Sequence, residues 1–401
     1  MISANRSFAK RLVRSGIGWL DERTGIVDLL RKGLYEAVPH RGAWFYTLGS
    51  VTLVLILNQL VTGIFLTMIY VPSTVEAWRS LHFIKEHDVF ASIVRGMHLW
   101  GAYILLLVIG LHMVRTFVSG SYKRPRELNW VTGVVLLLVV LGMAITGAFL
   151  PWDQAAYWTA VVTTNIPSYT PVIGGFIRSL WRGGDLVGPL TLLRTYGIHI
   201  WLLPTILFST IGAHLYLLRK HGEFGSYVNY RGNYRSGVGP GADEDQDQAP
   251  PPEREFEPPY PGVPTDDLWA APLQTDDFYP HQTFKDGLVS VLMMGLVLGM
   301  AVGYGAPLEE AANQATVTYT PVPEWFYLPL DQLLVLVPKQ LISMVLWVPL
   351  AGVVLLLALP FFDRGAERSP FERPVIMVPG AIILLFMLAL TALGSGRLFN
   401  L

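Results

Sequence analysis

Seven apolar stretches, each long enough to cross a lipid bilayer, are the feature that most constrains the fold of this chain. A spanning helix needs about 20 apolar residues, because each residue adds only about 1.5 Å. The 401 residues are 52% hydrophobic and only 15% charged, which is typical of a polytopic membrane protein. The sequence therefore predicts an all-α integral membrane protein with seven transmembrane helices. The seven stretches are Trp44–Val71, Ala91–Phe117, Asn129–Leu150, Thr195–Arg219, Phe284–Gly305, Lys339–Phe362 and Pro374–Gly396.

Four histidines lie inside two of these stretches and form two pairs of similar spacing. His98 and His112 are fourteen residues apart, and His199 and His214 are fifteen apart. At about 100° and 1.5 Å per residue, each pair returns to nearly one helix face, about 21 Å apart along the axis. A lone intramembrane histidine is more often a hydrogen-bonded packing residue, but two matched pairs favour function. Two such helices side by side predict two sites that grip flat cofactors between imidazoles, and haem is the natural candidate.

Glycines repeat the same interval in two other apolar stretches. Gly49 and Gly63 are fourteen residues apart, as are Gly133 and Gly147. A missing side chain leaves room for close approach, either of another helix or of a flat macrocycle.

Two arginines lie one helical turn from the histidines. Arg95 precedes His98 by three residues, and Arg115 follows His112 by three. Each guanidinium is placed to pair with a haem propionate. The alternative is an arginine that extends toward the membrane surface, and this alternative is stronger for Arg115.

The polar segments divide the chain into four regions. We expect a cytoplasmic or interfacial arm over 1–43, with an amphipathic helix near Gly25–Tyr35, then a four-helix module over 44–221 that binds two haems. Residues 222–282 have the Pro- and Gly-rich composition of a cytoplasmic linker, and a three-helix module over 283–401 completes the chain.

The distribution of Lys and Arg predicts the orientation. The amino-terminal arm and the second–third and sixth–seventh loops are richer in these residues than the opposite loops. Because basic loops stay on the cytoplasmic side, we expect a multi-pass membrane protein with a cytoplasmic amino terminus. The chain contains no cysteine, which excludes disulfides, iron–sulfur ligation and thioether-linked haem within it. Nothing indicates a nucleic-acid partner.

Two further motifs complete a family resemblance. With the histidines, glycines and arginines, the stretch from Gly147 to Trp152 (Gly-Ala-Phe-Leu-Pro-Trp) and the stretch from Pro323 to Phe326 (Pro-Glu-Trp-Phe) resemble cytochrome b, the quinol-oxidising core of the cytochrome bc and bf complexes. The fifteen-residue histidine step and the seven helices look more like the bf-type branch. There the protein is usually split after the fourth helix, and this chain looks like the fused version.

The resemblance implies cofactors, partners and an outer catalytic site. It implies two non-covalent haem b groups, an outer one on His98 and His199 and an inner one on His112 and His214. The partners would be a Rieske-type iron–sulfur protein, a cytochrome c-type subunit, menaquinone or ubiquinone, the lipid bilayer and a second copy of the complex. Quinol would be oxidised at an outer site formed by Pro323, Glu324, Trp325, Phe326 and Trp152.

The resemblance also implies roles for individual acidic and basic residues in proton transfer and quinone binding. Glu324 would accept a quinol proton, as buried carboxylates with a raised pKa can, and its alternative is a loop salt bridge. Asp331 replaces an aromatic residue that the family often carries, and it would share the proton traffic. An inner quinone site would include Arg219, Lys285 and Asp286. Asp286 would deliver protons there, although a helix amino-terminal carboxylate is nearly as good an interpretation.

One position departs from the family. The bf-type branch carries a cysteine at the start of the first helix that attaches an additional haem, and this chain has Thr47 there. A covalent haem is therefore not expected.

Two other functions are compatible with intramembrane histidines. One is a dihaem membrane anchor of a dehydrogenase or hydrogenase, which would lack the Pro-Glu-Trp-Phe loop. The other is a proton or metal transporter, which would show no haem absorption.

Overall fold

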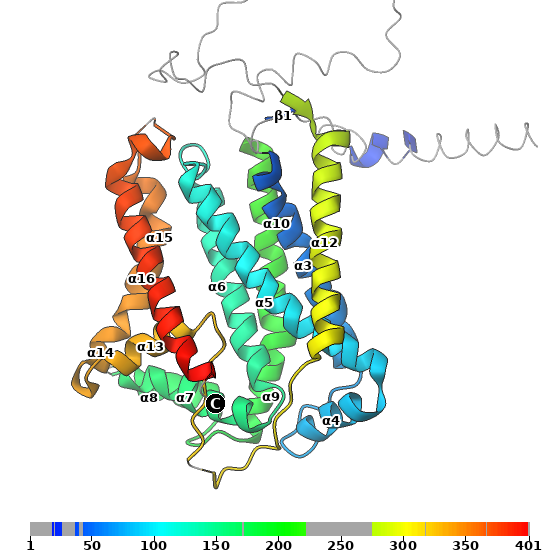
Figure 1. Ribbon diagram of the computed structural model, residues 1–401, viewed down its shortest axis with the longest axis vertical. Coiled ribbons are helices and arrows are strands. Elements are labelled where there is room, and N and C mark those ends of the chain that lie inside the picture. The colour runs from blue at the N-terminus through cyan, green and yellow to red at the C-terminus, as the bar shows by residue number, and fades with distance from the viewer. Residues whose placement is uncertain are drawn as a thin grey trace, which may run out of the picture. The chain divides into compact units, whose positions relative to one another are not determined.

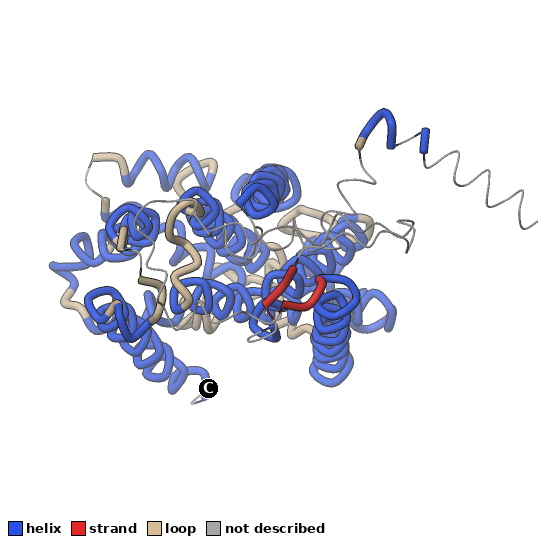
Figure 2. The backbone as a smooth tube through the Cα atoms, turned by 90° about the horizontal axis from the view of Figure 1, so that it is seen from above, coloured by secondary structure: helices blue, strands red, loops and turns tan. Residues whose placement is uncertain are grey.

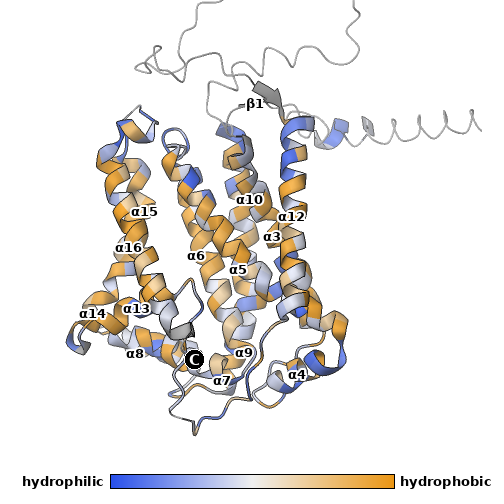
Figure 3. Cartoon of the chain, in the orientation of Figure 1, coloured by the Kyte–Doolittle hydropathy of each residue, from blue (hydrophilic) through white to orange (hydrophobic). Residues whose placement is uncertain are grey.

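The described part of the chain has seven helices long and apolar enough to cross a membrane (Figure 1), so the predicted all-α fold with seven spans is confirmed. The computed structural model describes residues 18–19, 21–25, 37–39, 43–170, 172–221, 275–316, 318–365 and 367–399. The expected amphipathic helix near Gly25–Tyr35 and most of the expected linker lie outside these residues. The long helices are apolar along their middles and more polar toward their ends (Figure 3).

The elements follow one another in a fixed order. They are β1 (Ala37–Pro39), α3 (Ala43–Thr67), α4 (Ala77–His87), α5 (Val89–Val118), α6 (Glu127–Phe149), α7 (Gln154–Asn165), η1 (Ile166–Tyr169), α8 (Gly174–Arg182), α9 (Pro189–Gly197), η2 (Ile198–Leu202), α10 (Leu203–His221), β2 (Thr275–Asp277), η4 (Phe278–Gln282), α12 (Thr283–Tyr304), α13 (Leu328–Leu336), η5 (Lys339–Leu341), α14 (Ile342–Val345), α15 (Trp347–Phe362), η6 (Pro370–Glu372) and α16 (Pro374–Phe399).

The structure differs from the sequence expectations in the sixth span. That span does not begin as one helix at Lys339, because η5 and α14 precede α15. The segment after α6 forms the helices α7 and α8. Asp153 caps α7 by accepting a hydrogen bond from the Ala156 amide (2.9 Å), and Gly183 ends α8 in the left-handed conformation (φ 77°).

Two compact units divide the chain. The first comprises Met1–Thr47 and Arg219–Val289, and the second comprises Leu48–Leu218 and Ser290–Leu401. In the first unit, β1 and β2 pair antiparallel, with Ala37 opposite Asp277 (Figure 2).

The helices of the second unit give it two distinct ends. The order of the helices places α4, α7, α8 and α13 at one end, which we call the Glu324 end. The α5–α6 and α15–α16 turns lie at the other, which we call the Asp363 end. Each end has a buried core. The core at the Glu324 end includes Tyr70, Ala77, Phe149, Trp152, Tyr157 and Leu192, and that at the Asp363 end includes Tyr122, Trp130 and Val134.

An extended segment after α12 crosses the Glu324 end and is held by contacts from three other parts of the chain. The indole of Trp100 donates to the carbonyl of Gly305 (2.7 Å), and that of Trp78 donates to the carbonyl of Glu309 (2.8 Å). Further along, the Ala312 amide donates to the carbonyl of Trp152 (3.2 Å). These contacts fix the path of the chain that leads to Glu324.

Candidate functional site

The two histidine-bearing helices bring His98 and His199 opposite each other. Their ring centroids are 6.4 Å apart and the ring planes are inclined by 74°. Two imidazoles that ligate one metal ion from opposite sides, each at about 2 Å, have their centres about 6 Å apart. The pair therefore fits a single iron held between two nitrogen ligands. His112 and His214, the other pair, lie close enough to interact electrostatically.

The four glycines lie directly against these imidazoles. A methyl group built on Gly147 would lie 2.9 Å from Cε1 of His199, and one on Gly63 would lie 3.2 Å from Cε1 of His98. The corresponding distances from Gly49 to His112 and from Gly133 to His214 are both 3.5 Å. The glycines therefore make room for the histidine rings of the neighbouring helices, which is the close approach of another helix that the sequence suggested as one alternative.

Threonines contact the second nitrogen of three histidines. Thr62, Thr132 and Thr146 place their hydroxyl oxygens 2.9, 2.9 and 3.0 Å from Nδ1 of His98, His214 and His199 respectively. Each hydroxyl already donates its proton to a backbone carbonyl of its own helix. The oxygen therefore accepts the Nδ1–H of the imidazole, which leaves Nε2 as a metal ligand.

The fifteen-residue step between His199 and His214 is accommodated by a π-helical turn. The turn spans Ile198–Leu202, and its bond runs from the Leu203 amide to the carbonyl of Ile198. Pro204 follows at once and has no N–H to donate to the preceding turn, which explains the position of the irregularity. The turn absorbs one additional residue, so that a step of fifteen has the geometry of fourteen in a regular helix.

The two arginines lie on α5 as the sequence predicted, but Arg95 has additional partners. Its guanidinium donates to the carbonyls of Ala306 (2.9 Å) and Pro307 (2.7 Å) in the extended segment after α12. Arg95 therefore helps to hold that segment in place. Arg115 lies in the last turn of α5, close enough to His112 for their charges to interact.

Glu324 is the centre of the second cluster of candidate residues. One of its carboxylate oxygens, Oε2, accepts a hydrogen bond from the hydroxyl of Tyr103 on α5. Phe326 packs edge-on against Tyr103 and against Trp325, with ring centroids 5.9 and 5.4 Å apart. The carboxylate therefore sits in a mostly aromatic environment.

Electrostatics at Glu324 favour the protonated form. Burial raises the pKa of Glu324 above its ordinary value, the hydrogen bond from Tyr103 lowers it, and the nearby charge of Asp153 raises it. The net result is a raised pKa. A carboxylate of this kind is suited to accept a proton from a bound hydroxyl.

The other residues proposed for the outer site differ in burial and in the element that carries them. Pro323, Trp325 and Phe326 are half-buried next to Glu324 in the chain, and Asp331 lies in the first turn of α13. Trp152 is buried in the core at the Glu324 end, where its ring packs against Tyr157 at 5.8 Å.

The residues proposed for the inner quinone site lie in the first compact unit. Arg219 is in the last turn of α10, and Lys285 and Asp286 are in the first turn of α12. Gln282 donates from its side-chain amide to Asp286 Oδ1 (2.8 Å).

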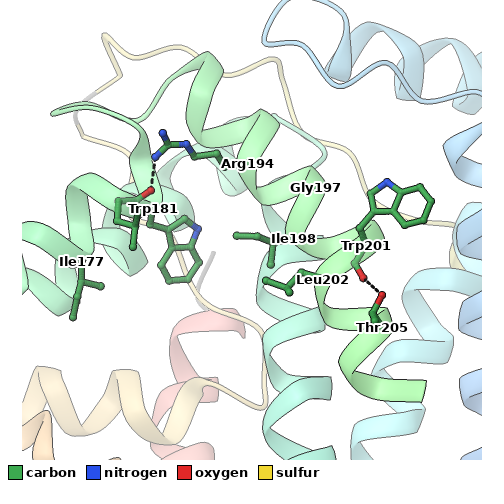
Figure 4. Close-up of a pocket in the computed structure, with 9 residues that line it drawn as sticks. Ile177, Trp181, Arg194, Gly197, Ile198, Trp201, Leu202 and Thr205 are labelled. Atoms are coloured by element: carbon green, nitrogen blue, oxygen red, sulfur yellow. Dashed lines mark hydrogen bonds between the residues drawn. The ribbon is translucent and has the colours of Figure 1, made fainter. Parts of the chain in front are cut away.

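A separate apolar groove of about 770 Å³ lies between α8 and the α9–α10 helices (Figure 4). Trp181 and Ile198 line it, and Arg194 donates to the carbonyl of Leu180 at its edge. None of the histidines, arginines or acids proposed from the sequence lines this groove.

Sequence reasoning missed Tyr103, Asp153 and the three threonines. Each threonine comes directly before one of the glycines, so a repeated Thr-Gly pair was the available signal. For Tyr103, the available signal was a polar hydroxyl group inside an apolar span. Asp153 had no local signal, because its contact with the segment before Glu324 is tertiary: the Glu309 amide, 156 residues away, donates to its Oδ2 at 3.1 Å.

Comparison with known proteins identifies the class. The family described as "Cytochrome b/b6/petB" matches residues 35–222, and the one described as "Cytochrome b(C-terminal)/b6/petD" matches residues 311–398. The chain therefore belongs to the cytochrome b/b6 family. It is a cytochrome b subunit of the kind found in quinol:cytochrome c reductase and b6f-type complexes, which transfer electrons across a membrane.

Two relatives and one solved structure illustrate this membership. The menaquinol:cytochrome c reductase cytochrome b subunit of Bacillus subtilis (strain 168) is 40% identical over 215 residues, which is 52% of this chain and 96% of that protein. Cytochrome b6 of Synechococcus sp. (strain RCC307) is 39% identical over 207 residues, 52% of this chain and 95% of that protein. A chain of "Hyperthermophilic respiratory Complex III" superposes with a TM-score of 0.75 at 26% identity, and the match covers 94% of this chain and 91% of that one.

These matches decide between the functions compatible with the sequence. Both halves of the chain match cytochrome b, which disfavours the dihaem anchor and the transporter. The family binds haem b, and the apolar helices make this a multi-pass membrane protein.

Proposed function

We propose that this chain oxidises quinol beside Glu324 and passes electrons across the membrane to a second quinone site, as part of a quinol:cytochrome c oxidoreductase or one with a similar acceptor. The observation that carries the proposal is the joint position of two groups on α5. His98 faces His199, and Tyr103, five residues later, contacts Glu324. A candidate iron site and a candidate proton acceptor are therefore served by the same helix, five residues apart.

Two b-type haems would be held non-covalently, one by His98 and His199 and one by His112 and His214. When bound, they supply one-electron redox chemistry at each end of the bundle. The fit rests on the imidazole separation, the glycines against each ring and the threonines that leave Nε2 available. Arg95 and Arg115 would pair with haem propionates.

Oxidation of a quinol releases two protons and two electrons. Glu324 would accept one proton from the bound quinol through its carboxylate, whose raised pKa suits this role. Pro323, Trp325, Phe326 and Trp152 would shape the quinol pocket. Asp331, seven residues after Glu324, would share the proton traffic.

We also propose an inner quinone site, two partner subunits and an orientation in the membrane. Arg219, Lys285 and Asp286 would bind quinone on the cytoplasmic side, and Asp286 would deliver protons there. A Rieske-type iron–sulfur protein would take one of the two electrons of quinol, because this chain has no cysteine with which to hold such a cluster. The other electron would cross the membrane toward the second quinone site. A cytochrome c-type subunit and a second copy would complete the complex in a bacterial inner membrane, with a cytoplasmic amino terminus.

Substitution of Glu324 tests the proposed quinol site. Glu324→Gln keeps the side-chain shape but removes the proton acceptor, so we expect outer-site turnover to fall about 100-fold while both haem spectra persist. Reduction of the inner haem through the cytoplasmic quinone site should survive. The double variant with Asp331→Asn should be slower than either single variant if the two acids share protons. Unchanged turnover in the double variant would reject this proton route.

Substitution of the histidines tests the haem assignment. His98→Ala or His199→Ala should remove one haem, and His112→Ala or His214→Ala should remove the other. A reduced-minus-oxidised spectrum with a pyridine haemochrome assay counts the haems in each variant. Retention of both haems in all four correctly inserted variants contradicts the assignment.

A further inference from the structure

Helix α5 presents a tyrosine to the segment that carries Glu324. Tyr103 follows His98 by five residues, which rotates it by about 140° around the helix and moves it about 7.5 Å along the axis. His98 faces His199, so Tyr103 faces a different neighbour, and that neighbour is Glu324. The same helix therefore serves the candidate iron site with one face and the candidate proton acceptor with another.

The ring of Tyr103 is held in place by other aromatic side chains. Trp100 packs edge-on against it with centroids 5.5 Å apart, and Phe326 does so at 5.9 Å. Trp100 is itself fixed, because its indole donates to the carbonyl of Gly305. A ring held on two sides gives its hydroxyl a defined position relative to the Glu324 carboxylate.

The charged and titratable groups that face Glu324 act in opposite directions. Tyr103 comes from α5 and donates to Oε2, which stabilises the ionised carboxylate. Asp153, at the start of α7, is near enough to raise the pKa of Glu324 by its negative charge. The carboxylate of Asp153 accepts from the amides of Ala156 and Glu309, and its charge also interacts with Arg95. In the structure, Tyr103 is thus the group that counteracts burial and Asp153.

We propose that Tyr103 is a positioning residue for the proton acceptor of quinol oxidation. Its hydroxyl donates to Oε2 of Glu324, which stabilises the ionised carboxylate relative to the protonated one, and leaves Oε1 as the oxygen that meets the quinol. The proton released by quinol then binds to Oε1, and the hydrogen bond to Oε2 persists. This inference rests on the proposed role of Glu324.

The pH profile of Tyr103→Phe provides the test. The experiment uses the whole purified complex with the full-length chain. The rate at which quinol reduces the electron acceptor, a cytochrome c, is measured between about pH 5 and 9. At low pH, kcat/KM should fall as Glu324 becomes protonated, and we call this part of the profile the acid limb. Loss of the hydroxyl removes a charge-assisted hydrogen bond to the carboxylate, so the acid limb should move up by about one pH unit. The rate should fall about tenfold on that limb and recover to the wild-type plateau at high pH. Tyr327→Phe is the matched control, since the Tyr327 hydroxyl donates to the carbonyl of Leu141 (2.6 Å) and should not affect the limb.

Each outcome separates this inference from the proposed function. A uniform loss of rate at all pH values would mean that Tyr103 has only a structural role. Glu324→Gln should abolish the acid limb, and if it does so while Tyr103→Phe leaves the limb in place, only the present inference fails. If Glu324→Gln leaves the limb intact, the proposed function of Glu324 fails. Infrared difference spectroscopy of the carboxyl C=O stretch gives a second readout. The pH at which half of this band has appeared should move together with the acid limb in Tyr103→Phe.

Discussion

The hydroxyl oxygen of Thr146 lies 3.0 Å from Nδ1 of His199, and the next residue, Gly147, packs against the same imidazole. One Thr-Gly pair thus supports a histidine in two ways. The threonine fixes the Nδ1–H tautomer and the glycine gives the ring its space. The pattern recurs at His98 and His214, whereas Gly49, which lies against His112, is preceded by Leu48.

Substitution of Thr146 tests its contribution to haem binding. Thr146→Val removes the acceptor of Nδ1–H at nearly constant size, so we expect haem retention at His98 and His199 to weaken about tenfold. Titration of the apo-complex with haem, followed by difference spectra, measures this effect. Thr52→Val is the control, because the Thr52 hydroxyl donates to the carbonyl of Leu48 on its own helix. Equal haem affinity in the two variants would show that Thr146 has no such role.

Substitution of each glycine by alanine should be tolerated better the further the added methyl group lies from the neighbouring histidine ring. Gly147→Ala places a methyl group 2.9 Å from His199 and must displace the ring, whereas Gly49→Ala and Gly133→Ala give ordinary contacts at 3.5 Å. Gly63→Ala, at 3.2 Å, should be intermediate. We therefore expect Gly147→Ala to lose the haem at His98 and His199 first on mild heating. The prediction is wrong if Gly49→Ala is as damaging as Gly147→Ala.

Thr47 predicts the absence of a covalently attached haem. A hydroxyl cannot form the thioether bond that a cysteine makes, and the chain has no cysteine elsewhere. Denaturing electrophoresis with a haem stain should therefore show no signal at the mass of this polypeptide. A Thr47→Cys variant expressed with a haem-attachment system is the positive comparison. A stained band in the unmodified protein contradicts the prediction.

A buried ionic cluster at the Asp363 end joins the α5–α6 turn to the α15–α16 turn. Asp363 accepts from Lys123 (2.7 Å) and from Arg373 (3.1 Å), and the hydroxyl of Tyr122 also donates to it. Burial by itself raises the pKa of Asp363, but the hydrogen bonds from Lys123, Tyr122 and Arg373 outweigh it and leave the pKa below its ordinary value.

Removal of this carboxylate should destabilise the fold. Asp363→Asn leaves two buried cations without their counter-charge, which costs about 3–5 kcal/mol. Because the pKa of Asp363 is lowered by folding, its contribution is complete above its unfolded pKa of about 4 and is lost as the pH falls through the folded value. The difference in melting temperature between the variant and the original should therefore be largest at neutral pH and shrink below about pH 4. Glu367→Gln is the control, since Lys123 donates to the backbone carbonyl of Glu367 (2.7 Å), which this substitution keeps.

The sequence by itself determined the number of spans, the histidine pairs and the family. These depend on local periodicity, because an apolar run of about 20 residues and a spacing of fourteen are meaningful in any packing arrangement of helices. The sequence also contained the reason for the fifteen-residue step, because Pro204 interrupts the regular helix after His199.

The tertiary structure alone decided the surroundings of Glu324 and of Asp363. Tyr103 and Glu324 are 221 residues apart, and Lys123 and Asp363 are 240 apart. Such contacts carry no local periodicity. Glu324 reaches Tyr103 because the segment after α12 is held across the Glu324 end by Trp100, Arg95 and Trp78. Lys123 reaches Asp363 because the α5–α6 and α15–α16 turns meet at the Asp363 end. Buried polar groups must find partners wherever the packing brings them. Which tyrosine faces the carboxylate, and which lysine pairs with the aspartate, therefore depended on the packing of distant helices and not on the neighbouring sequence.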